Sequence, residues 1–271
     1  LCIRGSVKTW VSDMSDAQSI ELCDKELVQT QALFNDEILV DQIDGDWAKV
    51  NVANQRDDSD HRGYPGWTPV KLLSDRQVSY PPVTVTVRVA RPTATLYNTS
   101  KDPLMEISMG TIFPQIKADG DWLKVATPLG NCYLKTEAVQ LQYVGENAGE
   151  TMVEMAKQFL GKRYLWGGTS SYGYDCSGFV YALHRVLGFD IPRDADDQHE
   201  DGLVLKPEEI LPGDLAFFAY EHGTGQVHHV GMYIGNGKMI ESRTPGKKVD
   251  IASLTEYKFA SELAGFRRYW R

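Results

Sequence analysis

Residues 175–188 read Asp-Cys-Ser-Gly-Phe-Val-Tyr-Ala-Leu-His-Arg-Val-Leu-Gly and predict an amphipathic helix with a cysteine in its first turn. Gly188 supplies the stop, because glycine readily adopts the left-handed conformation that ends many helices. The apolar side chains of the stretch fall on one stripe of the helix; they are Phe179, Val180, Leu183, Val186 and Leu187. The pattern therefore predicts a helix from about Asp175 to Leu187 that presents Cys176 at its N-terminus.

A second helix and a run of strands flank this segment. Residues 151–160 show the apolar periodicity of a helix. After the turn Leu211-Pro212-Gly213-Asp214, the pattern predicts only strands, at Leu215–Tyr220, Val227–Ile234, Lys238–Arg243, Val249–Ile251 and Gly265–Trp270. Helices followed by an antiparallel sheet predict an α+β fold for this part of the chain.

The earlier part of the chain contains a repeated motif. The sequence Asp-Gly-Asp-Trp-x-Lys-Val occurs at residues 44–50 and again at 119–125, and each copy places a turn before an alternating strand. Asp-Gly turns before aromatic strands also arise by chance, but six identities in seven positions favour a duplicated all-β module. Pro81-Pro82 marks the joint between the copies. We therefore expect domains at residues 1–78, 79–145 and 146–271.

Composition and charge limit the possible partners. The 271 residues are 42% hydrophobic and 24% charged, as in ordinary globular proteins, and they carry a net charge of −9. This acidity argues against nucleic acid and against anionic membranes or wall polymers as non-specific partners, and it favours ligands that carry an amine. No apolar run approaches the roughly 20 residues that cross a bilayer.

The four cysteines do not form a recognisable framework. Cys2, Cys23, Cys132 and Cys176 include no Cys-x-x-Cys pair, so we expect no zinc site, no other metal and no cofactor. Free thiols favour a reducing compartment, and residues 1–8 lack the apolar core of a signal peptide, which together predict a cytoplasmic protein. Because the chain opens with Leu1, the alternative is that a segment upstream of Leu1 was removed.

Cys176 is a candidate nucleophile. A free thiol is mostly protonated at neutral pH, whereas unpaired N–H groups and the dipole at a helix start favour the thiolate and can hold a developing oxyanion. The alternative is a buried structural thiol, since free cysteine is among the most buried residue types. Asp175 is a candidate helix cap, but its charge then opposes thiolate formation, so we expect it to have a second role in contact with substrate.

Two histidines on a downstream strand are candidate bases for this thiol. Alternation along residues 227–234 puts His229 on one face and His228 on the other, and by chemistry alone either can accept the proton. If residues 235–237 form a three-residue loop, position 231 pairs with 241, and His229 and Glu241 become diagonal neighbours on one face. A two-residue loop would separate them. Glu241 then orients the imidazole; the alternative is a solvated strand carboxylate.

Five ordered motifs resemble the NlpC-type cysteine peptidase family, a compact relative of the papain fold, here preceded by two bacterial SH3-like barrels. The matching pieces are Tyr164–Gly168, Asp175–Phe179, Ile191–Asp194, Leu211–Leu215 and His229–Gly235. With the barrels, the resemblance covers essentially the whole chain. It implies an α+β, papain-like catalytic domain in which Cys176 is the nucleophile and His229, rather than His228, is the base. Its third polar member falls at Glu241, where relatives commonly carry histidine.

The family resemblance also implies a substrate. Members cleave the γ-D-glutamyl bond to a diamino acid, meso-diaminopimelate or L-Lys, in murein peptides. The recycling type requires a free N-terminal L-Ala, which it clamps between the catalytic domain and the first barrel. The residues that match or adjoin family contacts with substrate are Tyr64, Trp166, Asp175, Ser177, Asp194, Ala195 and His228, with Ala195 in place of a serine. Without the resemblance, Tyr64 is equally explained as a packing aromatic beside Trp67. Trp166 is expected to line the cleft, and the alternative is a purely packing role.

The sequence is compatible with three functions. The first is a cytoplasmic, monomeric dipeptidyl-peptidase that acts on freed murein peptides, with no nucleic-acid or membrane partner. The second is a secreted autolysin that uses its barrels to hold the intact wall. The third is a murein-peptide binding protein without catalytic activity, against which the complete Cys176–His229 pair weighs.

Overall fold

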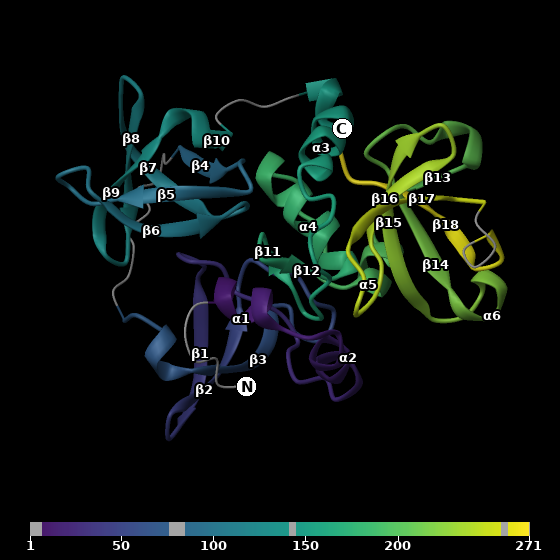
Figure 1. The fold of residues 1–271 in the computed structure, drawn as a ribbon, viewed down its shortest axis with the longest axis horizontal. Coiled ribbons are helices and arrows are strands. Elements are labelled where there is room, and N and C mark those ends of the chain that lie inside the picture. Colours follow the sequence, from purple (N-terminus) through teal and green to yellow (C-terminus); the bar gives the residue numbers. More distant parts are fainter. Residues whose placement is uncertain (1–6, 76–84, 141–144, 256–259, 271) are drawn as a thin grey trace.

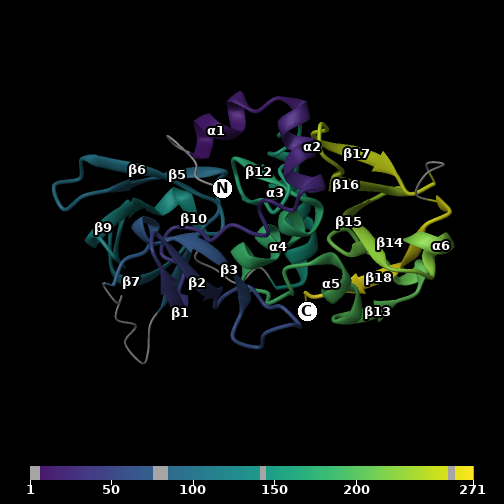
Figure 2. The ribbon, with the colours of Figure 1, turned by 90° about the horizontal axis from the view of Figure 1, so that it is seen from below.

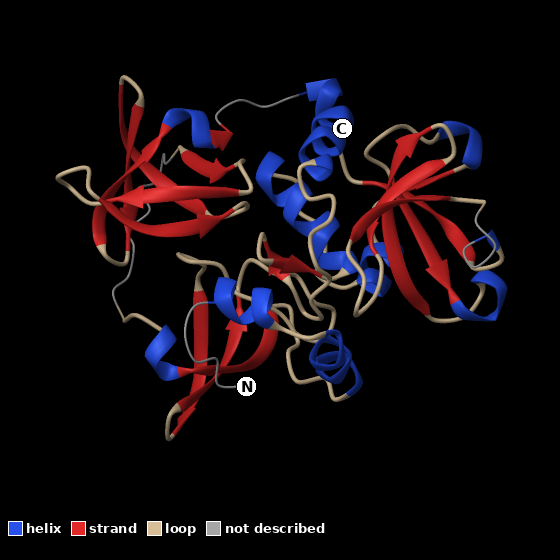
Figure 3. Ribbon diagram, viewed as in Figure 1, coloured by secondary structure: helices blue, strands red, loops and turns tan. Residues whose placement is uncertain are grey.

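The computed structural model describes residues 7–75, 85–140, 145–255 and 260–270, which form three structural groups (Figure 1). Two β-rich groups come first along the chain, and a group of helices packed on a six-stranded sheet follows them (Figure 3). The α+β fold class predicted from the sequence is therefore confirmed. The predicted domain limits fall in or beside residues 76–84 and 141–144, outside the described residues, and stay predictions.

The first group begins with two helices, α1 (Val7–Asp13) and α2 (Asp16–Asp24), in a region that the sequence analysis expects to be β-rich. A capping box starts α2: the Ser15 hydroxyl accepts from the N–H of Gln18 at 3.2 Å, and the Gln18 side chain accepts from the N–H of Ser15 at 2.8 Å. The sheet that follows has the order β1-β2-β3. Its strands are β1 (Ile38–Asp44), β2 (Trp47–Val52) and β3 (Tyr64–Pro69), before a 3₁₀ turn at Val70–Leu72.

The second group is a seven-stranded arrangement with the order β10-β4-β7-β8-β9-β5-β6. Its strands are β4 (Thr86–Val89), β5 (Thr93–Tyr97), β6 (Pro103–Ser108), β7 (Ile112–Asp119), β8 (Trp122–Thr127), β9 (Gly130–Lys135) and β10 (Val139–Gln140). The two copies of the repeated motif form equivalent hairpins, because Asp44 pairs with Trp47 and Asp119 pairs with Trp122. Alternate side chains of these strands fill a separate apolar core.

The third group packs helices against an antiparallel sheet with the order β13-β18-β14-β15-β16-β17. The helices are α3 (Ala148–Lys157), α4 (Cys176–Leu187) and α5 (Ala195–Glu200). The strands of the sheet are β13 (Leu203–Leu205), β14 (Leu215–Ala219), β15 (Val227–Gly235), β16 (Lys238–Ser242), β17 (Val249–Ser253) and β18 (Leu263–Arg268), and a hairpin of β11 (Thr169–Ser170) and β12 (Gly173–Tyr174) precedes α4. None of the helices among the described residues is both long and apolar enough to cross a bilayer.

One part of the predicted strand run is wrong. Between β14 and β15 the chain makes a single helical turn, α6 (Tyr220–Gly223), in which Glu221 and His222 adopt left-handed backbone angles with φ of 53° and 58°. Non-glycine residues rarely adopt this conformation, and apolar periodicity carries no signal for it. The five predicted strands otherwise correspond to β14 through β18, with ends that differ by a few residues.

Helix α4 lies at the centre of the molecule and is the element on which the other groups converge (Figure 2). Its predicted ends are confirmed: Asp175 is the N-cap, and Gly188 has a φ of 86° at the C-terminal end. Tyr181 donates to the carbonyl of Asn54 at 2.6 Å, and Arg185 forms an ion pair with Asp36. Since α4 thus binds the first group directly, the helix and that group are held together.

Candidate active site

Cys176 opens helix α4 and is only half-buried. The N-cap side chain of Asp175 accepts from the N–H of Gly178 at 2.6 Å, which fixes the first turn. Gly178 also permits a close approach: a β-carbon there would lie 2.1 Å from the carbonyl oxygen of Gly168. The Asp175–Phe179 motif and the end of the Tyr164–Gly168 motif therefore form one packed unit around the thiol.

His229 reaches the thiol from strand β15. Nε2 of the ring lies 2.5 Å from Oε2 of Glu241, and the ring also forms a hydrogen bond with the Cys176 side chain. Because Nε2 is committed to Glu241, Nδ1 is the ring atom left for the thiol. Burial alone would lower the pKa of His229, but the bonds to Cys176 and Glu241 outweigh that effect and raise the pKa to about 9. The structure thus brings the three predicted catalytic side chains together.

The hairpin that aligns His229 with Glu241 differs in detail from the predicted one. Gly235 pairs with Lys238, so the loop holds two residues, not the three expected from the sequence. A register shift between Tyr233 and Gly235 adds one unpaired residue to the first strand, so that Tyr233 pairs with Met239, as the three-residue loop would also require. A bulge next to a tight turn therefore has the same effect on side-chain faces as the longer loop.

Glu241 is fully buried, and hydrogen bonds from two cationic side chains compensate its negative charge. Burial raises the pKa of this carboxyl group, but hydrogen bonds from His229 and Arg243 more than reverse the effect and lower the pKa below its usual value. The Nε of Arg243 lies 2.7 Å from Oε1 of Glu241. Arg243 was not among the predicted site residues, although it lies two residues after Glu241 in the predicted strand Lys238–Arg243, a spacing that places two side chains on one face.

Asp175 has a partner that sequence analysis also missed. The buried guanidinium of Arg193 contacts both carboxylate oxygens of Asp175, at 3.2 and 2.6 Å, and donates to the Ser177 hydroxyl at 2.9 Å. Because Arg193 neutralises Asp175, that carboxylate caps the helix without leaving an uncompensated negative charge beside Cys176. The conflict between capping and thiolate formation is thereby removed.

Tyr64 and Asp194 join the first group to the catalytic group. The hydroxyl of Tyr64, at the start of β3, donates to Oδ2 of Asp194 at 2.9 Å. Asp194 directly precedes α5, whose first residue is Ala195, and its side chain keeps 38% of its surface exposed. Burial raises the pKa of Asp194, and the nearby Arg193 opposes that shift. Asp194 is therefore the more accessible of the two predicted carboxylates.

Trp166 and His228 occupy separate positions around this centre. Trp166 packs on an apolar cluster that includes Leu22 and Leu165, so the N-terminal helices support its ring. The ring of His228 stacks on Tyr220 with centroids 4.2 Å apart, and its Nε2 lies 3.3 Å from a carboxylate oxygen of Glu262. His228 thus has partners different from those of His229, consistent with His229 as the base.

Tyr164 is a further residue near the thiol. Its side chain is buried, and burial followed by the charges of Cys176 and Asp175 raises its pKa well above the ordinary value. The phenol therefore stays protonated and can donate a hydrogen bond close to the reacting sulfur. The sequence analysis placed Tyr164 in a family motif but not among the site residues.

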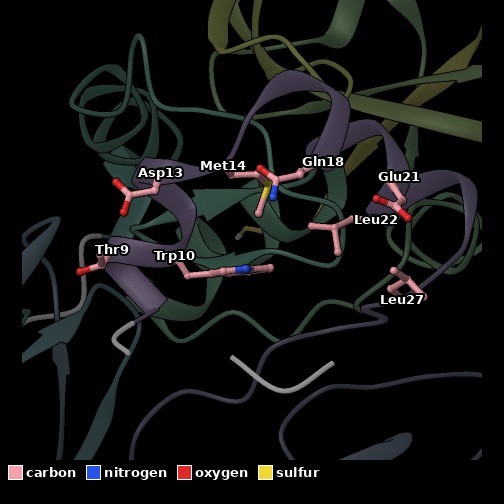
Figure 4. Close-up of a pocket in the computed structure, with 8 residues that line it drawn as sticks. All are labelled: Thr9, Trp10, Asp13, Met14, Gln18, Glu21, Leu22 and Leu27. Carbon is pink, nitrogen blue, oxygen red and sulfur yellow. The ribbon is translucent and has the colours of Figure 1, made fainter. Parts of the chain in front are cut away.

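A separate pocket of about 400 Å³ opens against α1 and α2 (Figure 4). It is lined by Thr9, Trp10, Asp13, Met14, Gln18, Glu21, Leu22 and Leu27. Its lining includes none of the residues that the sequence predicts for the site, and we assign it no part in the reaction.

The raised pKa of His229 has a consequence for the pH dependence of turnover. We expect kcat to fall above about pH 9, because the imidazolium that must protonate the leaving amine loses its proton there. Since the pKa in the folded protein exceeds the ordinary 6.5, the same interactions stabilise the fold fully below about pH 6.5 and stop doing so as pH rises through about 9. Measuring kcat avoids interference from the substrate's own amino group, which titrates near pH 8. A basic limb near pH 6.5 would contradict the assignment.

Fold and site together define a class: a papain-like cysteine hydrolase, with its thiol at a helix start and its base on a neighbouring strand. The NlpC/P60 family model matches residues 161–268, and the YKFC SH3b2 domain model matches residues 89–141. The chain belongs to the NlpC/P60 family of cysteine peptidases, which confirms the resemblance seen in the sequence.

Individual relatives match over nearly the whole chain. The gamma-D-glutamyl-L-lysine dipeptidyl-peptidase of Bacillus subtilis (strain 168) is 36% identical over 97% of this chain and 88% of its own length. The protein of the same name from Bacillus cereus is 36% identical over 96% of this chain and 80% of its own length. A crystal structure of an NlpC/P60 family protein from Bacillus cereus has a TM-score of 0.87 at 33% identity, with 98% of this chain and 90% of that chain covered.

Proposed function

We propose that this enzyme is a dipeptidyl-peptidase that hydrolyses the γ-D-glutamyl bond to a diamino acid in murein peptides with a free N-terminal L-Ala. The product is L-Ala-γ-D-Glu, and the leaving group is L-Lys or meso-diaminopimelate. The observation that carries this proposal is the bond between Tyr64 and Asp194, which joins the first group to the catalytic group at the site. The two Bacillus relatives, both gamma-D-glutamyl-L-lysine dipeptidyl-peptidases by name, support the same reaction.

The catalytic steps follow from the chain Cys176–His229–Glu241. The Cys176 thiolate attacks the γ-carbonyl carbon, while the helix-start N–H groups and the phenol of Tyr164 stabilise the oxyanion. His229, as imidazolium, gives its proton to the leaving amine when the carbon–nitrogen bond breaks. Water, deprotonated by the same imidazole, then hydrolyses the thioester and regenerates the thiol. Glu241 holds the ring and stabilises its charged form throughout.

Selection for a free amine rests on the uneven roles of the two carboxylates. Asp175 is already neutralised by Arg193, whereas Asp194 shares only one longer contact of 3.3 Å with that guanidinium. An L-Ala ammonium that reaches Asp194 supplies the missing positive charge. Tyr64, on the first sheet, closes the space behind the alanine, so that no further residue can precede it. The proposed clamp makes the enzyme exo-acting.

The proposed role is the recycling of freed murein peptides by a cytoplasmic monomer. The experiment that tests it compares the soluble tripeptide L-Ala-γ-D-Glu-L-Lys with intact sacculi. We expect release of L-Ala-γ-D-Glu from the tripeptide and no measurable solubilisation of sacculi, because peptides within the wall lack the free amine. Digestion of sacculi at a comparable rate per bond would support the autolysin instead.

A further inference from the structure

The buried carboxylate of Glu241 creates a chemical problem that Arg243 solves. Glu241 is 0% exposed, and burial by itself favours the protonated acid. A protonated Glu241 would donate a hydrogen bond to Nε2 of His229, so that the neutral ring would carry its own proton on Nδ1. That tautomer faces the thiol with a donor and cannot accept the thiol proton. The carboxyl group must therefore stay ionised for His229 to act as the base.

We propose that Arg243 is a positioning residue that keeps Glu241 ionised and oriented, and through it sets the tautomer of His229. This inference rests on the proposed catalytic role of Cys176, His229 and Glu241, and it adds a fourth member to that chain. Each carboxylate oxygen of Glu241 has its own donor: Oε1 accepts from Nε of Arg243 at 2.7 Å, and Oε2 accepts from His229 at 2.5 Å. The two bonds together fix the rotation of the carboxylate.

The surroundings distinguish this pair from an ordinary surface salt bridge. Exposed ion pairs contribute little because water screens both charges. Here the carboxylate has no solvent contact and only the arginine side chain is partly exposed, at 30%. The charged groups that face Glu241 are His229 from β15, with Cys176 of α4 behind it, and Arg243, one residue past the end of β16. Its register partner on β17, Asp250, is exposed.

The test uses the full chain with Arg243→Gln and Arg243→Lys. We expect Arg243→Gln to lower kcat about tenfold with little change in KM, because it removes a charged hydrogen bond from a group that does not touch substrate. The acidic limb of the pH profile of kcat should move upward by about one pH unit, since a less compensated Glu241 takes up its proton earlier. Arg243→Lys restores the charge and should recover most of the activity and the original limb.

A readout that needs no substrate separates this inference from the proposed function. The rate at which iodoacetamide alkylates Cys176 at pH 5 should fall in Arg243→Gln and recover in Arg243→Lys, whatever peptide the enzyme cleaves. The matched control is Arg91→Gln, because Arg91 lies in the second group and donates to the backbone of Glu137. Thermal unfolding is recorded for all three variants. An unchanged acidic limb and alkylation rate in folded Arg243→Gln would overturn the inference, as would equal losses in the glutamine and lysine variants.

Discussion

Turnover of L-Ala-γ-D-Glu-L-Lys should fall by roughly 10⁴-fold or more when Cys176 is replaced by alanine, because removal of a covalent nucleophile abolishes the acyl-enzyme route. The fold should be unaffected. The thiol is half-buried at a helix start whose cap, Asp175, and close glycine packing at Gly178 do not depend on it. The measurement is a steady-state assay together with thermal unfolding of the same preparation.

Cys132→Ala is the matched control for this substitution. Cys132 is buried in the core of the second group, and its thiol lies 3.6 Å from the hydroxyl of Thr127. Its replacement removes a thiol of similar chemistry from a part of the molecule that takes no part in the reaction. Activity per folded molecule should match the wild type. If Cys176→Ala keeps activity near the wild-type level, the sulfur is not the nucleophile.

N-acetylation of the substrate's alanine should reduce kcat/KM by on the order of 10²- to 10³-fold. The acetyl group removes the positive charge and leaves Asp194, beside the buried phenol of Tyr64, with only its 3.3 Å contact to Arg193. Removing one partner of a buried ion pair costs about 3–5 kcal/mol, and the 38% exposure of the Asp194 side chain places the expected effect at the lower end of that range. The measurement compares kcat/KM for the blocked and free tripeptides under identical conditions.

Asp194→Asn provides the corresponding change on the enzyme. If the clamp is correct, this variant should cleave the free peptide more slowly, and the penalty for acetylation should shrink, because the two changes remove the same interaction. Equal rates for blocked and free peptides with the wild-type enzyme would refute the clamp. A penalty that stays the same size in Asp194→Asn would show that another group binds the amine.

The parts of the fold that sequence could predict are those fixed by local patterns. The start of α4 at Cys176 and its stop at Gly188 follow from capping and apolar spacing, and the two Asp-Gly hairpins follow from turn chemistry. The placement of His229 and Glu241 on one face also follows from strand alternation, provided that an odd number of residues separates the paired positions of the two strands. Strand alternation predicts the correct faces for both side chains, but the predicted loop length is wrong, because residue types do not reveal a bulge.

The parts that could not be predicted depend on contacts between distant segments. Arg193 was visible in a motif, but only the folded chain brings its guanidinium onto the Asp175 carboxylate 18 residues away. The capping-box residues Ser15 and Gln18 of helix α2 are present in the sequence, but the apolar pattern that follows them is short and weak, so the helix was not predicted. The left-handed turn at α6 leaves no periodic signal at all. The partners of buried charged groups therefore cannot be predicted from local sequence patterns.

The most direct test of the central claim is the identity of the atom that carries the acyl group during turnover. The enzyme is quenched in acid while it hydrolyses the tripeptide, and its peptides are mapped by mass spectrometry. We predict the added mass of an L-Ala-γ-D-Glu acyl group on the peptide that contains Cys176, and no such adduct in Cys176→Ala. Acylation of a different residue during undiminished turnover would contradict the account.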